Sequence, residues 1–107
     1  MSSIIKDYYE NAGVKPFLIE DKLDKLKKHS DIAAEFEYWI QNKQYRNDVS
    51  VEGYTVTDVA NMSHYLNGEG AFMFLIELRE NPEKAKYNYA KNAYFKAVEE
   101  RRAKDNE

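Results

Sequence analysis

The sequence predicts an all-α protein, a single domain over residues 1–107 with about five helices around a buried central helix (residues 70–80). Seven of the eight residues from Ala71 to Leu78 are apolar. Such a segment has almost no polar face, so other helices must pack around it. Elsewhere apolar residues recur at helical spacing, and Gly, Pro and capping residues separate these stripes.

Three helices are predicted for the N-terminal part of the chain. The first runs from Ile4 to Ala12 and ends at Gly13, because glycine readily takes the left-handed conformation that follows a helix. Pro16 starts the second helix, and a cap at Ser30 or Asp31 starts the third. The apolar stripes of the second and third helices are Ile19, Leu23, Leu26 and Ile32, Ala33, Phe36, Trp39, Ile40.

The middle of the chain combines a polar loop with two more helices. Residues 44–53 lose the helical pattern, and an extended piece is predicted at residues 49–54. Thr55 starts the next helix, with Asp58 three residues later as its partner in a capping box. Two glycines in the turn at residues 67–70 end that helix, and the apolar helix follows as far as Glu80.

One long helix is predicted for the C-terminal part, from Pro82 to about Arg102. Asn81 as a cap, Pro82 at the first helical position and Glu83 in the first turn form its start signal. Residues 103–107 are predicted to be a frayed tail. The predicted core consists of Phe36, Trp39, Ile40, Val59, Leu66, Phe72, Leu75, Ile76 and Tyr94.

Composition excludes several classes of protein. The chain has no Cys, which excludes disulfides and thiolate metal sites. Its longest apolar run, Ala71 to Ile76, is far shorter than the roughly 20 residues that a membrane span needs. The N-terminus lacks the apolar region of a secretory signal. We therefore expect a soluble, cytoplasmic protein without a membrane partner.

Charge is distributed unevenly around the net value of −3. Residues 51–80 carry five acids and one base, whereas residues 82–104 carry seven bases and three acids. One interpretation is that both segments present ordinary solvated faces. The other is that they form two interaction surfaces of opposite sign, which meet head to tail in a homo-oligomer.

The sequence contains no motif typical of catalysis, cofactor binding or metal binding. We therefore expect no catalytic residue, no cofactor and no metal site. His29 and His64 lie on different predicted helices without carboxylates at metal-ligand spacing, and we expect them at caps or on the surface. Residues 55–60 look like the opening of a helix-turn-helix. The helix that follows offers Phe, Met, Leu and Ile where a DNA reader needs Arg, Asn or Gln.

Aromatic residues make up 14% of the chain, with nine Tyr among them. Tyrosine suits interfaces because its large, stiff ring tolerates both burial and water. Tyr65, Tyr87 and Tyr94 are expected to cover the helical core. The tyrosines in or near loops, or off the apolar stripes, fit an interface better: Tyr8, Tyr9, Tyr38, Tyr45 and Tyr54.

Three segments resemble a pattern found in small uncharacterised proteins of Firmicutes, including proteins of prophages and other mobile elements. They are Val51-Glu52-Gly53-Tyr54-Thr55, Asn67-Gly68-Glu69-Gly70-Ala71-Phe72 and Leu75-Ile76-Glu77-Leu78-Arg79-Glu80-Asn81-Pro82-Glu83-Lys84-Ala85. The resemblance implies an origin as a phage or mobile-element accessory protein. It carries no assigned activity.

Two function classes follow from these patterns. The first is a non-enzymatic module that binds or inhibits a host protein through the acidic middle, at Glu52, Tyr54, Asp58 and Glu69. The second is nucleic-acid binding by the basic last helix through Lys84, Lys91, Lys96, Arg101 and Arg102, with Tyr87 or Tyr94 stacking on bases if exposed. A small homo-oligomeric structural protein is a third possibility.

Overall fold

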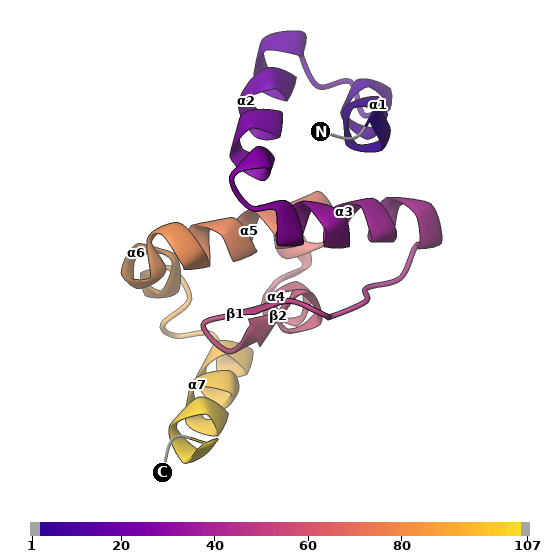
Figure 1. Cartoon of the computed structure of the whole chain (residues 1–107). Helices are drawn as coiled ribbons and strands as arrows, with labels where there is room; N and C mark the ends of the chain where they lie inside the picture. Colours follow the sequence, from indigo (N-terminus) through magenta and orange to yellow (C-terminus); the bar gives the residue numbers. More distant parts are fainter. Residues whose placement is uncertain (1–2, 106–107) are drawn as a thin grey trace. The chain divides into compact units, whose positions relative to one another are not determined.

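The computed structural model describes residues 3–105, and helices dominate it (Figure 1). The all-α class is confirmed, although the described residues form seven α-helices in place of about five. The chain divides into two compact units, one up to Arg46 and one from Asn47 onward. The expectation of one domain over residues 1–107 stays a prediction.

Unit 1 consists of three mutually packed helices, α1 (Ser3–Asn11), α2 (Pro16–Lys27) and α3 (Ser30–Asn42). Gly13 has a φ of +80° and ends α1 as predicted, while the amide of Val14 donates to the carbonyl of Tyr9 at 3.1 Å. Pro16 is the first residue of α2. The cap of α3 is His29, so the predicted cap at Ser30 or Asp31 is placed one or two residues late.

Aromatic rings fill the centre of unit 1. Tyr8 meets the rings of Tyr9, Phe36 and Trp39 edge to face, with centroids 5.5–5.7 Å apart. Phe36 and Tyr9 are buried, whereas Trp39 and Ile40 from the predicted core are half-buried. The tyrosine pair at residues 8–9 therefore packs inside this unit, contrary to the interface role predicted for it.

Unit 2 begins with a short antiparallel pair, β1 (Ser50–Val51) and β2 (Tyr54–Thr55), as predicted for residues 49–54. Both residues at its turn, Glu52 and Gly53, have positive φ, of 55° and 85°. This is the turn twist that suits a two-residue hairpin. A Cβ on Gly53 would lie 2.6 Å from Cδ of Arg102, so glycine leaves room for that side chain.

The predicted capping box starts α4 (Val56–Met62). The Thr55 hydroxyl accepts from the Asp58 amide at 3.2 Å, and the Asp58 carboxylate accepts from the Thr55 amide at 3.0 Å. A 3₁₀ turn, η1 (His64–Leu66), and Gly68 then lead into α5 (Glu69–Glu80). In the capping box of α4, Thr55 and Asp58 each accept a hydrogen bond from the backbone amide of the other, so this helix start can be predicted from sequence alone.

Helix α5 is the buried helix of unit 2, as its apolar sequence predicts. It packs against β1, α4, η1 and α6 (Pro82–Tyr87). Phe72, Leu75 and Ile76 are fully buried. Val59 is buried as well, whereas Leu66 and Tyr94 from the predicted core are half-buried.

The predicted single helix from Pro82 to Arg102 is wrong. Helix α6 ends at Tyr87, and α7 (Ala93–Asp105) follows a run of turns at residues 88–92. Asn92 causes the break, because its side-chain oxygen accepts from the amide of Phe95 at 2.9 Å, as a new helix cap. Its amide nitrogen donates to the carbonyl of Met62 at 2.5 Å, and this contact holds the break against α4.

Helix α7 continues to Asp105, so the frayed tail predicted for residues 103–107 does not begin at residue 103; residues 106–107 lie outside the described part. Among the described residues, none of the helices combines the length and the apolar character that a membrane span requires.

Candidate functional site

The acidic surface predicted at Glu52, Tyr54, Asp58 and Glu69 is only partly a surface. Tyr54 is fully buried and Asp58 is 7% exposed, whereas Glu52 is exposed and Glu69 half-exposed. Two of the four residues therefore lie inside unit 2. This corrects the predicted site, because the buried ring of Tyr54 and the buried carboxylate of Asp58 are not accessible to a partner.

Asp58 is the acceptor at the centre of a buried polar cluster. Its Oδ1 accepts from the Tyr94 hydroxyl at 2.8 Å. Its Oδ2 accepts from the Thr55 amide and hydroxyl at 3.0 and 3.1 Å, and lies 3.3 Å from Nη2 of Arg101. Burial alone raises the pKa of Asp58, but these hydrogen bonds and the Arg101 charge outweigh it and hold the pKa below its usual value.

A second polar cluster surrounds Glu99 on α7. Its Oε2 accepts from the Tyr54 hydroxyl at 3.0 Å and from Nη1 of Arg102 at 2.9 Å, and its Oε1 lies 3.4 Å from Nζ of Lys86. Lys86 also pairs with Glu52 at 3.3 Å. Burial and the neighbouring Glu99 carboxylate raise the pKa of Tyr54, so its hydroxyl stays protonated and donates.

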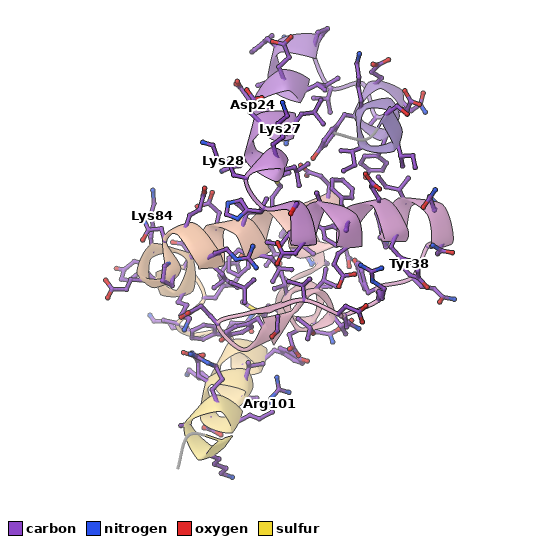
Figure 2. The ribbon with its side chains drawn as sticks, viewed as in Figure 1. Asp24, Lys27, Lys28, Tyr38, Lys84 and Arg101 are labelled. Carbon is purple, nitrogen blue, oxygen red and sulfur yellow. The ribbon has the colours of Figure 1, made fainter. Side chains whose placement is uncertain are left out.

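Charges of the acidic middle and the basic last helix therefore meet within one chain. Arg101 pairs with Asp58, and Arg102 lies near Glu52 at 4.0 Å. These pairs connect α7 to the hairpin and to the start of α4. Figure 2 labels Arg101 on α7. Because these acids and arginines pair with each other, they are not fully available to form two separate interaction surfaces of opposite sign.

Of the basic residues predicted to bind nucleic acid, Lys84, Lys91, Lys96 and Arg101 are exposed. Arg101 and the half-buried Arg102 also take part in the pairs above. Figure 2 shows Lys84 pointing outward from α6. Tyr87, at the end of α6, is 81% exposed. Together with Asn88, Ala90 and Lys91 it lines a hollow of about 290 Å³.

The tyrosines take roles that the sequence does not reveal. Tyr65 and Tyr87, predicted to cover the core, are each 81% exposed. Tyr54, predicted at an interface, is buried against Phe95 with its ring stacked at 5.9 Å. Tyr38 lies under the Arg46 guanidinium at 5.2 Å.

Unit 1 presents an apolar hollow that the sequence analysis did not single out. It lies between α1 and α2, measures about 600 Å³, and is lined by Lys6, Glu10, Val14, Pro16, Ile19, Glu20 and Leu23. A smaller hollow shares Glu20 and Leu23 and extends along α2 to Asp24 and Lys27. Phe17 and Leu18, which lie between Pro16 and Ile19 in the chain, are 62% and 41% exposed.

Within residues 3–105 no three His, Asp or Glu side chains gather where a metal ion could sit. His29 is buried at the start of α3, and the His64 ring lies 4.1 Å from that of Tyr65. Helix α5, which would be the reader of a helix-turn-helix, buries its apolar side chains in unit 2.

Comparisons of the chain with protein-family models, with curated proteins and with solved structures found no match.

Proposed function

We propose that this protein is a non-enzymatic protein-binding module that contacts its partner through the exposed surface of α2, which carries Phe17 and Leu18 and borders the hollow between α1 and α2. The observation that supports this proposal is the exposure of Phe17 and Leu18 on α2, the helix that also lines an apolar depression with Pro16, Ile19 and Leu23. Covering an exposed Phe or Leu side chain contributes about 1.5–3 kcal/mol. Large exposed apolar side chains are typical anchors of protein interfaces.

The lining of the hollow defines the chemistry of the partner. Val14, Pro16, Ile19 and Leu23 provide an apolar floor. Three carboxylates border the two connected hollows, from Glu10, Glu20 and Asp24, against two lysines, Lys6 and Lys27. The best fit is a segment with a row of apolar side chains and a basic residue beside it.

This surface takes the place of the acidic middle as the contact site. Tyr54 and Asp58 are buried and hydrogen-bonded, so they support unit 2 from within. The resemblance to mobile-element proteins of Firmicutes adds a setting to the proposal. In that setting the partner is a protein of the bacterial host, and this module binds it as an accessory protein or as an inhibitor.

The proposal is tested by capture followed by reconstitution. The tagged full chain and the variant Phe17→Ser/Leu18→Ser are used to capture proteins from a Firmicutes lysate. A captured protein is then purified, and its affinity for both chains is measured by calorimetry. Losing two anchor side chains should weaken binding by at least about tenfold, since 1.4 kcal/mol corresponds to a factor of ten.

The control is Tyr65→Ala, which removes an equally exposed ring from unit 2 and should leave the affinity unchanged. Circular dichroism verifies that every variant keeps its helices. Equal affinity of the wild type and the Phe17/Leu18 variant would refute the exposed surface of α2 as the contact site. Elution well above 12.6 kDa with no second protein bound would favour the homo-oligomeric structural role instead.

A further inference from the structure

The break between α6 and α7 presents an aromatic ring to solvent among basic side chains. Tyr87 is the last residue of α6 and is 81% exposed. Its ring borders a hollow that Asn88, Ala90 and Lys91 also line. An exposed ring next to a shallow depression offers a flat apolar face on which another planar group can stack.

Two lysines accompany this ring. Lys84 lies three residues before Tyr87 in the same helix, which places the two side chains on one face. Lys91 lines the hollow itself. Both lysines are exposed, and the nearest acid in sequence is Glu83, which is exposed as well.

Lys86 and Arg102, two other cations of this region, pair with acids within the unit. Lys86 lies 3.3 Å from Glu52 and 3.4 Å from Glu99, and Arg102 lies 2.9 Å from Glu99. Lys96 on α7 is exposed as well, and the Arg101 side chain is 54% exposed although it pairs with Asp58. The basic surface around the Tyr87 ring consists of Lys84 and Lys91, with the Asn88 amide beside them.

We infer that the surface formed by Lys84, Tyr87, Asn88 and Lys91 binds single-stranded nucleic acid. The Tyr87 ring stacks on one base, and the two ammonium groups neutralise the flanking phosphates. The Asn88 amide can donate and accept hydrogen bonds at the edge of the stacked base. In a duplex the bases are already stacked and paired, so this surface favours single strands.

Fluorescence anisotropy with labelled ten-nucleotide RNA and DNA strands, and with the corresponding duplex, tests the inference in ~50 and ~200 mM salt. The single strands should bind more tightly than the duplex. With two phosphate contacts, the logarithm of the binding constant should fall with that of the salt concentration with a slope of about −1.4. The RNA and DNA strands show whether the ribose hydroxyl contributes.

Two variants and a matched control separate stacking from charge. Tyr87→Ala should weaken single-strand binding by about tenfold, within the range measured for loss of one stacked base. Lys84→Gln/Lys91→Gln should weaken it and flatten the salt slope. Tyr65→Ala removes a ring of equal exposure from the same unit and should change neither quantity.

The inference is overturned if no single strand binds at ~50 mM salt, or if Tyr87→Ala and Tyr65→Ala behave alike. A stronger preference for the duplex would overturn it too. Because the residues lie in unit 2 and the proposed protein contact lies in unit 1, Phe17→Ser/Leu18→Ser should leave the anisotropy unchanged. Failure of one proposal is therefore distinguishable from failure of the other.

Discussion

At the scale of single residues, Asp58 shows how a local signal becomes a tertiary contact. Its carboxylate completes the capping box of α4 with Thr55, a partner three residues away. The same carboxylate accepts from Tyr94 and pairs with Arg101, which lie 36 and 43 residues further along the chain. A side chain that caps a helix thereby also attaches α7 to it.

Replacing this acceptor should destabilise the protein. In Asp58→Ala the Thr55 amide and the Tyr94 hydroxyl lose their partner in a buried place, which costs about 1–3 kcal/mol. Urea unfolding followed by circular dichroism measures the loss. Glu100→Ala on the exposed surface of α7 is the control and should stay within about 0.5 kcal/mol of the wild type. Equal stability of the two variants would refute the role of the buried cluster.

Acid should weaken unit 2 through the same carboxylates. The pKa values of Asp58 and Glu99 lie below their ordinary values of 3.8 and 4.5 in the folded chain. A carboxyl group with a lowered pKa stabilises the folded state above its unfolded pKa, and this contribution is lost as pH falls through the folded pKa. Stability should thus decrease below about pH 4.5, and thermal melts between pH 7 and pH 3 measure it.

The variant Asp58→Asn tests the origin of this acid sensitivity, because it removes one of the two titrating groups. Its melting temperature should be lower at pH 7 and should fall less between pH 5 and pH 3 than that of the wild type. If both chains lost stability in parallel over that range, the acid sensitivity would have to come from other carboxyl groups.

At the scale of elements, the break after α6 determines which side chains of the C-terminal part are accessible. A continuous helix would carry its cations along one rod, as the sequence indicates. The turns at residues 88–92 instead leave Tyr87 exposed, while α7 directs Glu99 and Arg102 toward the hairpin. Asn92 carries this arrangement through two hydrogen bonds.

Substitutions at Asn92 should separate its two contacts. Asn92→Ala removes the cap of α7 and the bond to Met62, and should cost about 1–2 kcal/mol, the usual range for a lost cap. Asn92→Ser keeps a capping oxygen but loses the amide donor to Met62, so its loss should be smaller. Asn88→Ala, at an exposed position of the same turns, is the control in urea unfolding. A cost for Asn88→Ala equal to that for Asn92→Ala would contradict the assignment.

At the scale of the whole molecule, each compact unit has its own core. Unit 1 buries aromatic rings around Phe36, and unit 2 buries α5. The only tryptophan, Trp39, lies in unit 1. It provides a fluorescence signal for that unit, whereas far-UV circular dichroism follows the helices of both.

Truncating the core of unit 2 should have a large effect. Leu75 is fully buried in α5, and Leu75→Ala should cost about 2–5 kcal/mol, the range for a lost buried Leu side chain. The loss is measured by urea unfolding with both probes. The expected single domain requires the fluorescence and dichroism transitions to coincide, and separate midpoints would contradict it. Unchanged stability would show that α5 is not the core.

Sequence alone predicts the features that depend on near neighbours along the chain. The capping box at Thr55 and Asp58, the turn at Gly13, the hairpin segment and the buried helix around Leu75 follow from spacings of one to four residues or from an apolar run. In each case the interacting groups lie within about one helical turn of each other along the chain. The all-α class follows from the sum of these local signals.

Positions of side chains relative to distant parts of the chain come from packing. Tyr54 is buried and Tyr87 is exposed, which is the reverse of what their local sequence indicates. Tyr54 is buried because Glu99 and Phe95 from α7 cover it. Arg101 and Arg102 pair with acids of the hairpin and α4 for the same reason. A burial or an ion pair between residues about 40 apart depends on where the backbone folds back, and no spacing in the sequence encodes that.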